Sequence, residues 1–208
     1  LVRKAEGIET AGSLNILFSD KTGTITKGML EVVDFFTADG KSIAIPELPK
    51  HERTKELLDF AIGKNTQSMY DGEHRVIGGN ATDQALMKFI GEATFRSLEA
   101  DKENMVTKSQ GFNSTNKFSQ ARIDRQGKTF YKGAPERLLA QASKYLDGNG
   151  EVKEINQAAL NEKIDALAAK AMRVLAFGYS EQEMTENKIN NDIVIIGLVG
   201  IRDDVRPE

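Results

Sequence analysis

The sequence predicts an α+β fold, in which an antiparallel sheet flanked by helices is inserted into a second, parallel-stranded α/β unit. One observation is a pair of apolar strand patterns near the two ends of the chain, at residues 14–19 and 193–201. The pattern at 193–201 is rich in β-branched residues, which suits a buried parallel strand. We therefore expect these two strands to share one parallel sheet, with residues 28–192 forming the separate, mixed unit between them.

The inserted segment mixes strand and helix patterns. Short β-rich runs bounded by turn residues predict strands, and apolar residues spaced by three and four predict helices. Thr82 is expected to cap the second helix, and Pro135 to begin the third. The expected strands are 29–36, 41–45, 105–112, 117–124, 128–131 and 173–179. The expected helices are 52–62, 82–90, 136–145 and 156–171.

Composition narrows the class of protein. The 208 residues are 39% hydrophobic and 28% charged, which is ordinary for a soluble globular protein with a sizeable core. A net charge of −3 offers no electrostatic reason to expect a nucleic acid or an anionic membrane surface as partner. The absence of cysteine excludes disulfides and thiolate metal sites. The longest apolar run, 193–201, is too short for a membrane-spanning helix, which needs about 20 residues.

The most informative motif is DKTGTIT at residues 20–26, directly after the first apolar strand. A carboxylate placed there lies at the edge where open α/β sheets carry their chemistry. Asp20 could accept a phosphoryl group as an acyl phosphate, with the charge of Lys21 offsetting the phosphate oxygens. Magnesium would bridge this carboxylate and the phosphate. A strand-end aspartate that only caps its own loop is the alternative, which the full seven-residue motif disfavours.

Thr22 indicates what happens to such an intermediate. Phosphatases of the haloacid dehalogenase type usually carry a second aspartate, which acts as acid and base, two positions after the nucleophile. Without that group, attack by water on the acyl phosphate should be slower. The sequence therefore predicts an intermediate that is kept rather than hydrolysed at once.

The motif at 20–26 resembles the phosphorylation signature of P-type ion-transporting ATPases, and residues 2–12 are similar to the segment that precedes it in that family. The resemblance implies that Asp20, Lys21 and Thr22 are catalytic and that Asp20 and Thr22 hold Mg²⁺. It also implies three segments. They are an edge of a haloacid-dehalogenase-like phosphorylation domain at 1–27, a nucleotide-binding domain at 28–192, and a hinge with re-entry into the incomplete phosphorylation domain at 193–208.

The sequence KGAPE, which begins at Lys132, resembles the nucleotide-binding motif of the calcium, sodium/potassium and proton pumps. Gly133 would let a ligand approach the backbone, and a helix starting at Pro135 would favour anionic phosphate. The resemblance assigns Lys132, Gly133 and Ala134 to ATP binding. Taken alone, the pentapeptide equally fits an ordinary strand-to-helix turn.

Two further segments resemble parts of the family's adenine pocket. In the first, Asp83 stands at a helix start where an acidic residue meets the adenine amino group; alone, it also fits a partner of the helix dipole. In the second, Phe112 is placed to stack on adenine, and Lys117 follows it. Ser114 takes the position of an arginine in mammalian calcium pumps. An isolated strand phenylalanine would more often belong to the core.

The last two segments complete the predicted site. Arg173 resembles the arginine that reaches the phosphates, and Leu175 the leucine that lines the pocket; a solvated strand arginine is the alternative. Residues 200–208 are similar to the second hinge, where Asp203 and Arg206 retain the charged ends. The resemblance therefore adds Asp203 and Arg206 to the ATP-binding set.

The whole pattern predicts the ATP-binding domain of a cation pump, most similar to bacterial calcium-type pumps. The parent would couple ATP hydrolysis, through the aspartyl phosphate at Asp20, to cation transport at the cytoplasmic face of a membrane. We expect the chain itself to be soluble and monomeric and to bind ATP without turnover, because the family's magnesium loop is absent. Its partners would be the rest of the phosphorylation domain and the actuator and transmembrane domains. A free-standing haloacid-dehalogenase-like phosphohydrolase is the alternative.

Overall fold

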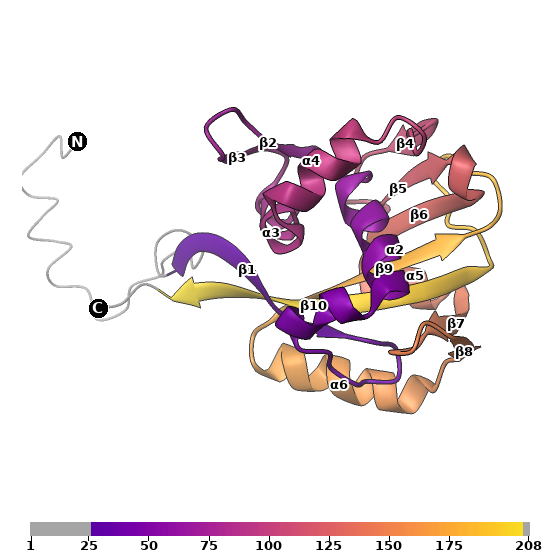
Figure 1. Cartoon of the computed structure of the whole chain (residues 1–208). Coiled ribbons are helices and arrows are strands. Elements are labelled where there is room, and N and C mark those ends of the chain that lie inside the picture. Colours follow the sequence, from indigo (N-terminus) through magenta and orange to yellow (C-terminus); the bar gives the residue numbers. More distant parts are fainter. Residues whose placement is uncertain (1–25, 206–208) are drawn as a thin grey trace, which may run out of the picture. The chain divides into compact units, whose positions relative to one another are not determined.

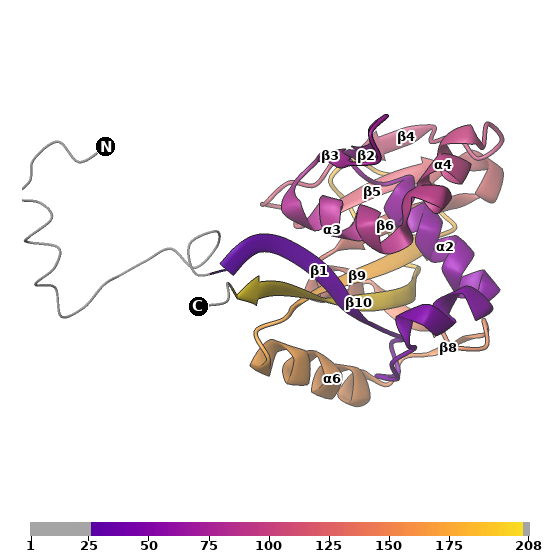
Figure 2. The ribbon, with the colours of Figure 1, turned by 60° about the vertical axis from the view of Figure 1, so that its left-hand side comes forward.

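The computed structural model describes residues 26–205 of the chain. Of the described residues, Leu30–Arg202 form one compact unit. This unit contains a sheet with helices on both sides (Figures 1 and 2). The sequence-based division at residues 27 and 192 stays a prediction.

The principal sheet is mostly antiparallel. Its strand order is β4-β5-β6-β9-β10-β7-β8, and β1 also pairs with β10. The pairing of β10 with β7 is parallel, and the pairings β4–β5, β5–β6, β6–β9, β9–β10 and β7–β8 are antiparallel. The strands are β1 Thr26–Phe36, β4 Lys108–Gln110, β5 Phe118–Ile123, β6 Lys128–Gly133, β7 Ala142–Leu146, β8 Val152–Glu154, β9 Arg173–Ser180 and β10 Ile193–Val205.

Helices cover both faces of this sheet. Helices α2, α3 and α4 pack on one face and α6 on the other (Figure 2). Helix α5 packs on the same face as α6. A separate two-stranded ribbon, β2–β3, precedes α3. The helices are η2 Ile45–Lys50, α2 Glu52–Gly63, α3 Ala81–Ile90, α4 Glu92–Ala100, η3 Asp124–Gln126, α5 Pro135–Leu139 and α6 Gln157–Ala169, and the ribbon strands are β2 Ser68–Tyr70 and β3 Val76–Gly78.

Neighbouring side chains of β6 show how the two cores form. Phe130 packs toward α2, with its ring centroid 5.6 Å from that of Phe60. Tyr131 points to the opposite face, where its ring lies 6.1 Å from Phe118. Because successive side chains of a strand alternate between faces, both faces of the central strands are buried. The result is a mixed α+β fold with a mostly antiparallel sheet, as predicted.

The partners of β10 show where the strand expected at 193–201 lies. Its expected parallel pairing with residues 14–19 stays a prediction, because those residues lie outside the described part of the chain. Among the described residues, β10 pairs antiparallel with β9, from Val194 opposite Tyr179 to Ile201 opposite Arg173, and parallel with β7. A near-continuous apolar run indicates burial on both faces, but it does not say which strand lies alongside or in which direction.

The helix expected at 136–145 is also wrong in its second half. Helix α5 ends at Leu139, and the chain then forms β7, which lies between β10 and β8. Tyr145 and Leu146 of β7 are buried. In a stretch this short, the apolar spacing fits either a helix or a strand. Pairing with β10 makes these residues a strand.

Two other expected strands are shorter or absent. The strand at 105–112 is limited to β4, and the one at 41–45 is replaced by a single bridge between Phe36 and Ser42, followed by η2. Pro46 opens that 3-10 helix, since a proline lacks the amide donor of a strand ladder. The elements β2, β3, β8 and α4 were not predicted. The other expected elements are confirmed, with ends shifted by a few residues.

Between residues 26 and 205, no helix combines the length and the apolar character that crossing a bilayer requires.

Candidate functional site

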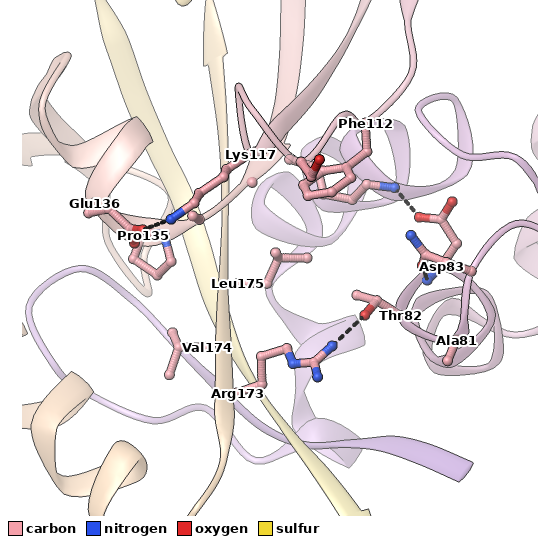
Figure 3. A pocket seen from close by; sticks show the side chains of 15 residues that line it. Ala81, Thr82, Asp83, Phe112, Lys117, Pro135, Glu136, Arg173, Val174 and Leu175 are labelled. Atoms are coloured by element: carbon pink, nitrogen blue, oxygen red, sulfur yellow. Dashed lines mark hydrogen bonds and ion pairs between the residues drawn. The ribbon is translucent and has the colours of Figure 1, made fainter. Parts of the chain in front are cut away.

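A cavity of about 720 Å³ opens where four distant segments meet. They are the start of α3, the loop 111–117, the β6–α5 junction and the start of β9, as Figure 3 shows. Nine residues of the predicted ATP-binding set line this cavity: Asp83, Phe112, Ser114, Lys117, Lys132, Gly133, Ala134, Arg173 and Leu175. Other lining residues were not predicted, among them Asn80, Thr82 and Glu136.

The floor of the cavity is a buried ion pair. Lys132 Nζ lies 2.6 Å from Asp83 Oδ1, and the two side chains are only 6% and 9% exposed. Lys132 Nζ also donates to the backbone carbonyl of Asn65 at 2.7 Å. Burial lowers the pKa of the Lys132 ammonium, although the negative charge of Asp83 opposes this shift. Both residues were expected to meet a ligand, and the structure shows that they first neutralise each other.

The start of α3 orients Asp83. Asn80 is the N-cap, and its Oδ1 accepts a hydrogen bond from the Asp83 backbone N–H at 2.8 Å. The prediction that Thr82 caps this helix is therefore wrong; its hydroxyl instead accepts from Arg173 at 3.2 Å. Gly79 has a φ of +64°, and an added Cβ would lie 2.4 Å from the hydroxyl of Ser68. Asparagine is a favoured N-cap, so Asn80 could have been identified from its place before the helix.

Gly133 is required by the chain itself. A Cβ at this position would lie 2.6 Å from the carbonyl oxygen of Lys117 and 2.7 Å from the Cβ of Phe118. The next residue, Ala134, donates its N–H to that same Lys117 carbonyl at 3.0 Å. Lys117 has a positive φ of 58°. The sequence suggested that glycine admits a ligand, whereas the structure shows that it admits the backbone of the loop 111–117.

The rim of the cavity consists of exposed side chains. Phe112 is 48% exposed, although phenylalanine is usually among the buried residues of a protein. Lys117 Nζ lies 3.7 Å from Glu136 Oε1, and these side chains are 56% and 65% exposed. Figure 3 shows Phe112, Lys117 and Arg173 around the opening. These groups are available to a bound molecule.

The start of α5 offers less positive electrostatic potential to a phosphate than expected. The helix has only five residues, from Pro135 to Leu139, although Pro135 does stand at its start as predicted. A helix dipole builds up over several turns of aligned peptides. Positive charge at this end of the cavity therefore comes mainly from lysine and arginine side chains.

The remaining predicted site residues are Asp20, Lys21, Thr22, Asp203 and Arg206. Asp20, Lys21, Thr22 and Arg206 lie outside the described residues. Asp203 lies near the end of β10 and is not among the residues that line the cavity. Within residues 26–205, no three histidine, aspartate or glutamate side chains are grouped so that they could hold a metal ion.

Comparisons with known proteins agree with this geometry. Residues 53–208 match the family described as P-type ATPase, cytoplasmic domain N. Over its whole length the chain is 31% identical to a putative plasma membrane-type calcium-transporting ATPase of Arabidopsis thaliana and covers 22% of that protein. It is also 31% identical to calcium-transporting ATPase 1 of Saccharomyces cerevisiae, with 100% of the chain and 24% of the relative covered.

A bacterial relative is similar to the same extent. The chain is 30% identical to a calcium-transporting ATPase of Listeria monocytogenes, with 99% of the chain and 24% of that protein covered. The chain thus spans less than a quarter of the length of these relatives. The family match covers most of the described sheet, its flanking helices and every segment that lines the cavity. The chain therefore belongs to the P-type ATPase cytoplasmic domain N family.

Proposed function

We propose that the cavity binds ATP and that this chain is the nucleotide-binding part of a P-type cation-transporting ATPase. The observation that carries the proposal is the meeting of nine predicted residues, from segments far apart in the sequence, around one cavity. The family match and the names of the relatives support the same conclusion.

Each part of the cavity has a role in this proposal. The exposed Phe112 ring stacks on the adenine base, and such stacking contributes about 1–3 kcal/mol per base in nucleic-acid complexes. The Asp83 carboxylate, held by Lys132 and by the cap of α3, accepts a hydrogen bond from the adenine amino group. Lys117 and Arg173 offset the negative charge of the phosphates. Leu175 adds apolar contact beside the base.

In the parent protein, we propose that this ATP phosphorylates Asp20. An Asp20 carboxylate oxygen forms a bond to the γ-phosphorus while the bond from that phosphorus to the ADP oxygen breaks. Asp20 and Thr22 would hold magnesium, since they offer the oxygen donors that it prefers, and the bound metal would offset charge on the phosphate. The chain alone would bind ATP without turnover.

The parent would transport a cation, and the names of the relatives favour calcium. It would carry this domain on the cytoplasmic side of a membrane, joined to the rest of the phosphorylation domain and to actuator and transmembrane domains. The family match disfavours the alternative, a free-standing haloacid-dehalogenase-like phosphohydrolase.

The decisive experiment is an ATP titration of the 208-residue chain by calorimetry or NMR. Phe112→Ala and Arg173→Ala should each weaken ATP binding by roughly 5- to 50-fold, because they remove stacking or phosphate contacts. Lys132→Ala is a poor test, since it leaves the Asp83 charge buried and unpaired.

Two exposed residues outside the cavity provide matched controls. Val152→Ala on β8 removes an exposed apolar side chain, and Arg125→Ala in η3 removes an exposed arginine. Both should bind ATP as the wild type does. The proposal is wrong if ATP does not bind, or if the cavity variants bind as tightly as these controls.

A further inference from the structure

The loop 111–117 presents the groups that the proposed ATP site most needs, and most of its residues are exposed. At its Lys117 end, the backbone is held by the hydrogen bond from Ala134. Phe112 is half exposed, and Lys117 lies in the rim of the cavity. A ring in this position would move freely unless the ends of its loop were fixed. Ordering such a loop only when ligand binds would reduce affinity, because the conformational entropy is then lost on binding.

One side chain from outside the cavity links the residue that precedes this loop to a residue near the end of the loop. Asn187 lies in the connection between β9 and β10, at residues 181–192. Its Oδ1 accepts from Gln110 Nε2 at 2.7 Å and from Asn116 Nδ2 at 2.9 Å. Its backbone N–H donates to Gln110 Oε1 at 2.8 Å. Gln110 stands two residues before Phe112, and Asn116 stands directly before Lys117.

The surroundings hold Asn187 in place. Its φ is +59°, a left-handed conformation that asparagine tolerates better than most residues. The buried Gln120 of β5 donates from Nε2 to Gln110 Oε1 at 2.8 Å and to the Thr185 carbonyl at 2.9 Å. The same glutamine therefore ties together β4, β5 and the β9–β10 connection.

We propose that Asn187 is a positioning residue for nucleotide binding, which acts by holding the loop 111–117 so that Phe112 is ready to stack on the base. This inference rests on the proposed ATP site. Asn187 does not line the 720 Å³ cavity, so its effect on ATP must pass through the loop.

The test compares ATP affinities of variants of the 208-residue chain. Asn187→Gly removes the amide and still allows the positive φ. It should weaken ATP binding by roughly 3- to 10-fold, a part of the stacking contribution. Asn187→Asp keeps an acceptor oxygen and should bind within about two-fold of the wild type. Asn116→Ala removes the hydrogen bond from the loop to Asn187 Oδ1 and should cause a smaller loss of ATP affinity.

The same measurement separates positioning from general damage. Asn191→Gly changes an asparagine of the same connection whose described side-chain partner is Gln182, outside the loop, and it should leave ATP affinity unchanged. In a Phe112→Ala background, Asn187→Gly should have little further effect, because the ring on which it acts is gone.

The outcomes distinguish the inference from the site assignment. Wild-type affinity in both Asn187→Gly and Asn116→Ala would overturn the inference, as would an Asn187→Gly loss that persists fully in the Phe112→Ala background. If the unaltered chain does not bind ATP, or Phe112→Ala binds normally, the proposed site itself is wrong and the inference falls with it.

Discussion

The floor and the rim of the cavity contain the same kinds of charged group in opposite environments. At the floor, Lys132 and Asp83 lie 2.6 Å apart and are almost fully buried. At the rim, Lys117 and Glu136 lie 3.7 Å apart, and more than half of each side chain is exposed. Water and salt weaken the rim pair, whereas neither floor charge could lose its partner without a large penalty.

This difference assigns different tasks to residues that the sequence groups together. Lys132, Asp83 and Gly133 belong to the motifs that identified the site, and each also makes a contact that shapes the cavity wall. Phe112 and Lys117 have exposed surface that a ligand could cover. We infer that the floor shapes the cavity and presents the Asp83 carboxylate to the adenine amino group, whereas the rim supplies the stacking ring and positive charge.

Breaking the floor pair should produce the largest effect. Lys132→Met should lower the free energy of unfolding by about 3–5 kcal/mol, because Asp83 is left buried and unpaired. Urea denaturation provides the measurement. The double variant Lys132→Met with Asp83→Asn should recover part of this loss, since no uncompensated charge remains. A loss below about 1 kcal/mol would mean that the floor pair is solvated and that the contrast with the rim is false.

Adding a side chain at Gly133 should have an intermediate effect on stability. Gly133→Ala should destabilise the fold by about 1–3 kcal/mol, because the new Cβ meets the Lys117 carbonyl and Phe118. Gly72→Ala is the matched control, since no atom lies within 4 Å of its added Cβ. Thermal unfolding of both variants would show the difference. Equal stability of the two would indicate that the loop 111–117 can move away from β6.

Changing the rim should barely affect stability. Glu136→Gln should alter the free energy of unfolding by less than about 0.5 kcal/mol, because the Lys117–Glu136 pair is exposed. It should instead raise ATP affinity by roughly two- to three-fold, since it frees Lys117 and removes a negative charge near the phosphates. Glu99→Gln, in an exposed pair with Arg96 on α4, should change neither quantity. Unchanged ATP affinity in Glu136→Gln would place the phosphates elsewhere.

Local chemistry explains which elements were predictable. The helix α2 was found because Leu57, Leu58, Ala61 and Ile62 lie on one helical face, and all four are buried. The strands β5 and β6 were found because a turn ending in Gly127, which has a φ of +61°, separates two β-rich runs. These signals depend on neighbours within a few residues, so the sequence alone contains them.

Other features depend on distant partners. The parallel contact with β10 turns residues 142–146 into a strand, although their spacing also fitted a helix. The hydrogen bonds of Asn187 with Gln110 and Asn116 join residues more than 70 positions apart. Such contacts leave no periodic trace in the sequence.

By itself, the sequence determined the family, the α+β class and the residues that gather around the cavity, because motif chemistry and apolar periodicity are local properties. Only the tertiary structure decided that Asp83 and Lys132 pair with each other, that Gly133 makes room for the chain and that β10 runs antiparallel to β9. The physical reason is that pairing, close approach and strand direction depend on which surfaces meet after folding, and the same local pattern satisfies several such arrangements.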